Sequence, residues 1–395
     1  MTERREVWIT GVGLLTCLGE GLETNWSHLA RGDRSPYDDK SFAPYIVHPL
    51  GPTNFDKQIP KKSDQRQMET WQRVGVYSAG LALSDAGIAG NAELLDRTDM
   101  IVAAGGGERD LAVDTTILAG LRKVNNPGAF LNERLMSDLR PTLFLAQLPN
   151  LLAGNISLVH GVVGASRTFM GEEAAGVDAV RVAQARIAAG QSELTLVGGA
   201  YNGTRWDVLL IFEFGGVVLK HIFAPVWDRG AEGGIAFATM GAFVVLESRE
   251  HAQARGARAR ARISQVFSDR NVRQPGDIET SLGRQWDSIA PKVDKARAVI
   301  ISGASGLEPA TAAERRALEN IGLPVRNTGT YIGHGVDSQF LANLGIACAV
   351  LEHGKLFAPT GTGDIGESPP ALSQAVVTSV GGWRGEGLAL VERVG

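Results

Sequence analysis

The sequence predicts an α/β protein in which mostly parallel sheets are covered by helices, and three observations lead to this fold class. Short apolar segments alternate with longer segments that have helical periodicity. Glycine is abundant, at 49 of 395 residues, which suits many tight connections between strands and helices. A chain of this length can bury a large core, and the rhythm of strand and helix returns in its second part. We therefore expect two related halves.

The first half begins with a strand over residues 7–10 that ends at Gly11 and Gly13. A helix that carries Trp26 follows. Apolar residues at close to helical spacing then predict one continuous helix over residues 61–86. Further along, we expect a buried strand, a helix and two more buried strands at residues 100–104, 174–191, 194–197 and 242–247.

The boundary between the halves is predicted near residues 248–258, which gives halves of residues 1–250 and 251–395. In the second half, we expect a strand, a helix, a glycine-rich turn, a helix and two strands at residues 298–301, 310–320, 329–333, 338–353, 376–378 and 388–391. A Rossmann-type enzyme would also have two such halves. The glycines after the first strand are not spaced G-x-G-x-x-G, which weakens that alternative.

Composition excludes several classes of function. The formal net charge is −4, so the overall charge gives no reason to expect a nucleic-acid partner. The two cysteines, Cys17 and Cys348, argue against a disulfide framework or a cysteine-based metal site, and we expect no metal. The N-terminus has no signal-peptide core, and no uncharged apolar segment is long enough to span a bilayer. We therefore expect a cytoplasmic protein without membrane insertion.

Five segments carry motifs in a fixed order. Residues 8–13 read W-I-T-G-V-G, residues 61–87 end in D-A-G, residues 164–200 end in G-G-A, residues 245–257 hold E-H-A and A-R-G-A, and residues 333–334 read G-H. Together they resemble the motifs of the elongating β-ketoacyl-carrier-protein synthases, in particular synthase II. The resemblance implies the thiolase fold: two related halves, each with a mixed five-stranded sheet, in five alternating layers (αβαβα). It also implies a dimer and no cofactor.

The segment that begins at Gly164 lacks the residue on which this family depends. The similar stretch of the family reads G-x-S-x-x-x-x-T-A-C-S-S-G, followed by a helix and a strand ending in G-G-A. Aligned without gaps, the nucleophilic cysteine falls on Glu173. The alignment rests on Gly164, Ser166, Gly176, Gly190 and residues 198–200. A surface acid that caps a helix is the alternative interpretation of Glu173.

The histidines that assist decarboxylation in this family are also incomplete. The first histidine corresponds approximately to Ala304, while His334 matches the second. His334 is either a retained site residue or a structural histidine. The gatekeeping G-F-G-G turn of the family resembles residues 381–384, so the resemblance implies that Gly382 and Trp383 lie at the substrate tunnel.

A glutamate at the nucleophile position changes the expected chemistry. The family needs a thiolate at a helix N-terminus, whereas a carboxylate is a poor nucleophile toward a thioester and would repel a malonyl carboxylate. The resemblance therefore implies a ketosynthase-like subunit that pairs with an intact ketosynthase, as a chain-length factor does, and that works with an acyl carrier protein. The chain also resembles companion synthases that build very-long-chain acyl groups for lipid A.

Two other classes of function stay open. One is a stand-alone enzyme with altered chemistry, such as malonyl decarboxylation or acyl transfer. The other is a non-catalytic homodimer that binds acyl chains or carrier protein. Basic residues that would dock an acidic carrier protein, or equally form a solvated charged edge, are Lys61, Lys62, Arg66, Arg258 and Arg260. If residues 255–262 form a strand, three of its four arginines would share one face.

Overall fold

The computed structural model describes residues 4–395 and contains two sets of five strands. The first set is β1 (Val7–Thr16), β4 (Asp99–Ala103), β5 (Ser166–Phe169), β6 (Leu194–Asn202) and β7 (Phe237–Ser248). The second set is β8 (Ala261–Asp269), β9 (Ala298–Ser302), β10 (Val325–Asn327), β11 (Gln374–Val380) and β12 (Glu386–Glu392). Two short strands, β2 (Gly19–Glu20) and β3 (Val47–His48), pair with β1 and β7.

Both sets have the same topology. Their strand orders are β5-β4-β6-β7-β1 and β10-β9-β11-β12-β8, so the third strand of each set lies at the edge, followed by the second, fourth, fifth and first. The first three strands in each order are parallel to one another. The fourth strand in each order, β7 or β12, pairs antiparallel with both of its neighbours. The sets join where β1 pairs antiparallel with β8, at Trp8 with Arg262 and Ile9 with Ala261. The two related halves with mixed sheets that the resemblance implies are confirmed, whereas the mostly parallel sheets expected from the alternation of elements are not, because two pairings in each set are antiparallel.

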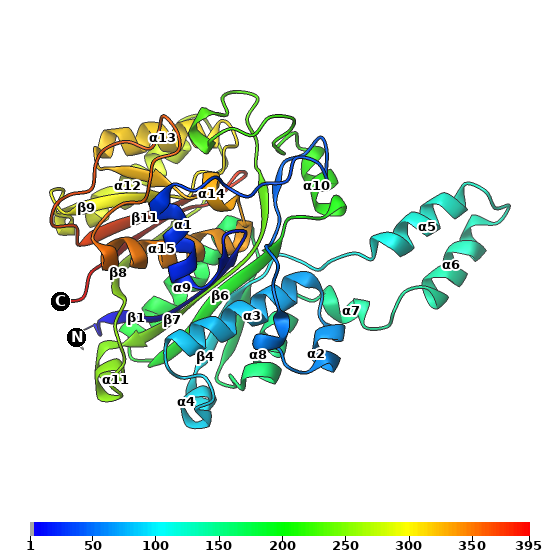
Figure 1. The fold of residues 1–395 in the computed structure, drawn as a ribbon, viewed down its shortest axis with the longest axis horizontal. Coiled ribbons are helices and arrows are strands. Elements are labelled where there is room, and N and C mark those ends of the chain that lie inside the picture. The colour runs from blue at the N-terminus through cyan, green and yellow to red at the C-terminus, as the bar shows by residue number, and fades with distance from the viewer. Residues whose placement is uncertain (1–3) are drawn as a thin grey trace.

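Helices form three layers around the two sheets (Figure 1). The outer helices of the first sheet are α3 (Thr70–Asp85) and α8 (Leu151–His160), and those of the second are α12 (Asp277–Ile289) and α13 (Ala310–Ile321). Between the sheets lie α9 (Glu173–Ala188) and α15 (Gln339–His353), each of which contacts strands of both sets. A helix covered on both sides must be apolar all round, and residues 339–351 of α15 are all buried. The predicted αβαβα arrangement is therefore confirmed.

The remaining helices connect these layers. They are α1 (Leu22–Arg31), α2 (Lys62–Gln67), α4 (Ala92–Arg97), α5 (Leu111–Leu121), α6 (Pro127–Ser137), α7 (Leu143–Ala146), α10 (Trp206–Glu213), α11 (Arg249–Ala254) and α14 (Gly329–Ile332), with 3₁₀ turns η1 (Phe55–Lys57), η2 (Val226–Asp228), η3 (Ala290–Lys292) and η4 (Val336–Ser338). The α5–α6 hairpin projects away from the layered body (Figure 1). Among residues 4–395, no helix is both long and apolar enough to cross a bilayer.

Two local predictions were wrong. The helix expected over residues 61–86 is interrupted, because Met68 adopts an extended conformation and buries its side chain, and Glu69 caps the start of α3 with a capping box. The first strand does not end at Gly11 and Gly13 but continues to Thr16. A Cβ on Gly13 would clash with the carbonyl oxygen of Ser78 in α3, so this glycine lets a helix pack closely on the strand instead of making a turn.

Two further predictions need correction. The glycine-rich turn expected at residues 329–333 is a helical turn, α14, that ends at Gly333 with φ of +69°. The basic segment of residues 255–262 is not one strand, because β8 begins only at Ala261. The division into halves at residue 250 stays a prediction, although β7 ends at Ser248 and α11 follows it directly.

Candidate functional site

Glu173 is the first residue of α9 and lies in the interior, with 3% of its surface exposed. Free backbone amides and the positive end of the helix dipole favour a carboxylate at this position. Its Oε1 atom lies 3.1 Å from Nε2 of His334, which is itself 2% exposed. The backbone N–H of His334 donates to Ala236, and its carbonyl accepts from Ala238, both at 2.9 Å. The fold therefore brings together two predicted site residues that are 161 positions apart.

Two more carboxylates surround this pair. Asp337 in η4 is 1% exposed and accepts a hydrogen bond from the backbone N–H of Gly105. Burial, together with the charge of Glu173, raises the pKa of Asp337 to about 8. The same two causes raise the pKa of Glu172, which precedes α9. The site thus concentrates acidic groups, and the raised pKa keeps Asp337 mostly protonated at neutral pH.

A cavity of about 440 Å³ opens in front of these acids. Glu172, Asp337, Tyr201, Arg205 and Arg384 form its polar part. Its apolar wall is made by Met170, Val208, Ile211, Phe212 and Val336. Arg205 is held by an ion pair to Asp207 at 3.2 Å, so its charge is already partnered. A cavity of this size with an apolar wall and few polar groups suits a small organic ligand or an acyl chain.

Backbone strain and unpartnered polar atoms mark the same place. Among residues 4–395, the non-glycine residues with positive φ are Glu172, Arg273, Val336 and His221, and two of them, Glu172 and Val336, line this cavity. Such conformations persist only where the surrounding structure enforces them, and they cluster at functional sites. Buried atoms with no hydrogen-bond partner within the described chain include Oε2 of Glu173, Oδ1 of Asp337 and Nδ1 of His334.

The other predicted site residues lie around this centre. Ala304, in the loop after β9, is 3% exposed and carries only a methyl group, so it can neither donate nor accept a proton. Gly382 and Trp383 belong to the turn between β11 and β12. The turn contacts the Ala304 loop, since a Cβ on Gly382 would lie 2.8 Å from Leu307 Cδ2. The Trp383 ring packs against Phe212, with a centroid distance of 5.4 Å.

The predicted docking residues fall into two groups. Arg260 is paired with Asp85, with Nε 2.6 Å from Oδ2, and with Glu352 at 2.9 Å, and Arg258 also pairs with Glu352. The charges of these two arginines are therefore committed to ion pairs within the chain. The second group is exposed on α2 and at its N-cap, and consists of Lys61, Lys62 and Arg66. Within this group, Lys62 pairs with Asp56. A docking role for this group stays a prediction.

Neither cysteine replaces the missing nucleophile at this site. Burial raises the pKa of both Cys17 and Cys348 to about 12, so both thiols stay protonated at neutral pH. Cys17 donates to the carbonyl of Tyr331 at 3.4 Å, and Cys348 lies within α15. Within residues 4–395, no cluster of three or more His, Cys, Asp or Glu side chains is arranged to hold a metal ion.

Sequence reasoning missed three residues of the site: Glu172, Asp337 and Arg273. Glu172 could have been found from its position directly before Glu173, because a neighbour of the aligned nucleophile position lies at the same helix start. Asp337 follows His334 by three residues in an otherwise uncharged segment, which was a second available signal. Arg273 gave no local signal, since its importance comes from contacts with residues more than 100 positions away.

Comparisons with curated proteins give relatives at low identity. The 3-oxoacyl-acyl-carrier-protein synthase 2 of Vibrio cholerae is 25% identical over 271 residues, which cover 66% of this chain and 62% of that protein. The nodulation protein E of Rhizobium leguminosarum bv. trifolii is 26% identical over 273 residues, or 66% of this chain and 63% of that protein. The match thus spans less than two thirds of the length of each of these relatives.

Solved structures share the fold over nearly the whole chain. A β-ketoacyl synthase from Burkholderia phymatum has a TM-score of 0.81 at 20% identity, covering 99% of this chain and 100% of that one. The ishigamide ketosynthase/chain length factor has a TM-score of 0.79 at 19% identity, with the same coverage. Residues 4–252 match the β-ketoacyl synthase N-terminal domain family. The chain therefore belongs to the β-ketoacyl synthase family.

Proposed function

We propose that this chain is a ketosynthase-like subunit of fatty-acid elongation that does not condense substrates alone and instead pairs with an intact ketosynthase, whose acyl tunnel it helps to shape. The observation that carries the proposal is the contact between Glu173 and His334 at 3.1 Å. A carboxylate occupies the N-terminus of α9, where a condensing enzyme of this family needs a thiolate, and it also engages the imidazole.

The surroundings support the loss of condensing chemistry. The Glu173 carboxylate would repel an approaching malonyl carboxylate, and the neighbouring acids Asp337 and Glu172, whose pKa values are raised, offer no positive charge to bind one. Ala304 has no group to assist decarboxylation, and the raised pKa of Cys17 and of Cys348 keeps both thiols protonated at neutral pH. Each of these features reduces the chance that a thioester intermediate forms on this chain.

Exposed apolar surface supports a partner chain. On the projecting hairpin and the helices next to it, Leu118, Met136, Phe144 and Leu158 are 64%, 80%, 69% and 67% exposed. In the described chain, β5 lies at the end of the first sheet and pairs only with β4, so its outer edge is open. Apolar side chains beside an unpaired strand edge are typical of a surface that another chain covers.

An intact ketosynthase is the partner that fits best, because one neighbouring structure is a ketosynthase/chain length factor. Another neighbour is a ketosynthase in complex with its acyl-carrier protein, which supports an acyl carrier protein as the second partner. Lys61 and Arg66, which are exposed before and after the ion-paired Lys62 in the sequence, offer positive charge to an acidic carrier protein. We further propose that the elongated acyl groups are very long, and this more specific proposal rests on the sequence resemblance.

The test is affinity purification of the tagged chain from its native cell, with partners identified by mass spectrometry. Stoichiometric recovery of a second ketosynthase with an intact Cys-His-His set is expected, and the product length made by the recovered pair tests the very-long-chain proposal. Phe144→Asp should reduce recovery of the partner at least tenfold, while Ser288→Asp, at an exposed position on α12, should not.

Two outcomes would contradict the proposal. Condensation of malonyl and acyl carrier-protein substrates by the pure chain, at a rate typical of enzymes, would show that no partner is needed. Recovery of the chain only with itself would remove the heterodimer. In that case, release of carbon dioxide from malonyl carrier protein that Glu173→Ala abolishes would identify a decarboxylase, and its absence would leave a non-catalytic homodimer.

A further inference from the structure

The turn between β11 and β12 covers the buried Glu173 carboxylate. Residues 381–385 form this turn, and the N–H of Gly381 donates to the carbonyl of Gly385 at 2.9 Å. A Cβ on Gly381 would lie only 3.1 Å from Oε2 of Glu173. The turn therefore lies against the carboxylate, and the glycine is required mainly by the turn itself, because the same Cβ would clash with the carbonyl oxygen of Arg384.

The turn also stands between two cavities. Arg384 lines the cavity of about 440 Å³ in front of Asp337. Gly382 lines a second cavity, of about 330 Å³, whose wall includes Arg273, Pro275 and Pro309. Because the turn covers Glu173 and borders both cavities, its displacement would expose the Glu173–His334 pair to solvent.

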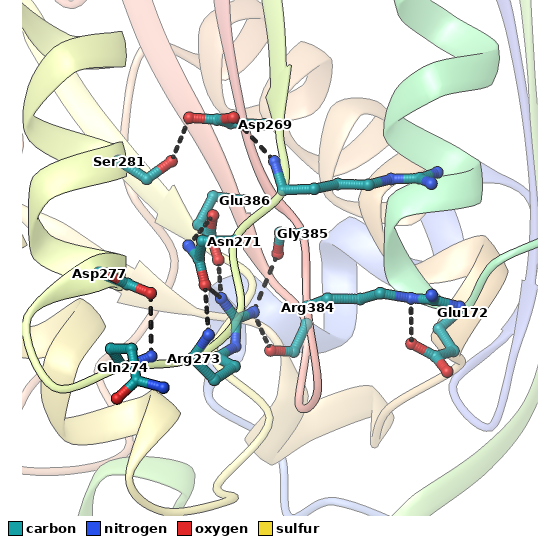
Figure 2. A network of polar contacts seen from close by, with 12 residues as sticks. Glu172, Asp269, Asn271, Arg273, Gln274, Asp277, Ser281, Arg384, Gly385 and Glu386 are labelled. Carbon is teal, nitrogen blue, oxygen red and sulfur yellow. Dashed lines mark hydrogen bonds and ion pairs between the residues drawn. The ribbon is translucent and has the colours of Figure 1, made fainter.

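One guanidinium holds both ends of this turn (Figure 2). Nη2 of Arg273 donates to the carbonyl of Gly381 at 2.5 Å and to that of Gly385 at 3.3 Å. Nη1 pairs with the carboxylate of Glu386, the first residue of β12, and donates to Asn271 Oδ1 at 2.9 Å. Asn271 in turn donates to the other oxygen of Glu386 at 2.7 Å. The planar fork of arginine suits this multidentate arrangement, which a lysine could not reproduce.

The Arg273–Glu386 pair is shielded from solvent, whereas the turn's other charged contact is not. The side chains of Arg273 and Glu386 are 16% and 0% exposed. Arg384, in contrast, is 53% exposed and lies 3.7 Å from Glu172, so water and salt weaken that contact. Arg273 also adopts a φ of +61°, a conformation that a non-glycine residue keeps only when its contacts enforce it.

We propose that Arg273 is a positioning residue that latches the turn of residues 381–385 shut over Glu173 and so closes this chain's own access to the Glu173–His334 pair. The latch requires no partner chain, so it stands or falls independently of the function proposed above. In a heterodimer, it would leave the partner's site as the one open to substrate.

The first test measures access to position 173 directly. In a chain carrying Glu173→Cys, iodoacetamide alkylation at that position is followed by peptide mass spectrometry, which separates it from the two native cysteines. Adding Arg273→Gln should raise the alkylation rate at least tenfold. Loss of a nearby positive charge would by itself raise the thiol pKa and slow alkylation, so an increase reports access. The matched control is Arg270→Gln, because Arg270 lies on the same loop, is 54% exposed and pairs with Asp178.

The second test uses hydrogen exchange of the peptide over residues 380–386 and leaves Glu173 unchanged. Arg273→Gln and Glu386→Gln should each speed exchange at least tenfold, and the double variant should add little, because both changes break one latch. Arg273→Lys keeps the charge but loses the fork, and it should also speed exchange. Folded variants that alkylate and exchange at the parent rate would overturn the proposal. If Arg273→Gln does not fold, Arg273→Lys and Glu386→Gln decide the question.

Discussion

Replacing Asp337 with asparagine should remove a loss of folding stability that grows as the pH rises. Burial and the charge of Glu173 raise the pKa of Asp337 from 3.8 to about 8. Between these two pKa values, the folded chain keeps a proton that the unfolded chain has lost. The free energy of unfolding therefore falls as the pH rises toward the folded-state pKa. Each pH unit is worth about 1.4 kcal/mol, so Asp337 should cost about 3 kcal/mol of stability between pH 5 and pH 7.

An asparagine side chain at this position would stay neutral and could still accept the hydrogen bond from Gly105. The free energy of unfolding of Asp337→Asn, measured by urea denaturation at pH 5, 6 and 7, should therefore exceed that of the parent by a margin that widens by about 3 kcal/mol. Asp287→Asn, on the exposed face of α12, is the control and should leave the margin constant. Parallel curves for Asp337→Asn and the parent would refute the reasoning, because they would mean that Asp337 binds no extra proton in the folded state.

Three other changes test the packing described above by urea denaturation. Gly13→Ala should destabilise the chain by about 2 kcal/mol or more, since its Cβ would meet the Ser78 carbonyl; unchanged stability would mean that β1 and α3 can separate freely. Gly283→Ala, within α12, should stabilise by about 0.5–1 kcal/mol, because no atom lies near its Cβ and alanine favours a helix; a loss of stability would contradict this. Glu247→Ala should cost about 3–5 kcal/mol, since it removes the fully buried carboxylate that pairs with the mostly buried guanidinium of Arg255; a cost under about 1 kcal/mol would show that solvent compensates Arg255.

Periodicity and glycine positions were enough to predict an α/β protein and most of its elements, whereas the mixed five-stranded sheets and the order of the layers were implied by the family resemblance. The apolar run of residues 298–301 became β9, and the helix expected over residues 310–320 became α13 (Ala310–Ile321). Local patterns could not predict the break at Met68, because the helical spacing of apolar residues continues through it and the buried position of its side chain depends on the surrounding core.

For the candidate site, the motif alignment predicted Glu173 and His334 as site residues, but not their contact at 3.1 Å. That contact needs two elements to meet: the N-terminus of α9 and the segment that follows α14. Asp337 gains its raised pKa only from burial next to Glu173, which no window of sequence contains.

The sequence by itself determined the order of the elements, the family motifs and the carboxylate at the start of α9. These features depend on residues close together in the chain, whose patterns are readable without coordinates. The tertiary structure alone decided which buried groups meet, as when Arg273 reaches Gly381 and Glu386 to close the turn over Glu173. Such contacts join distant segments, and the energy of a buried charge depends on every group packed around it.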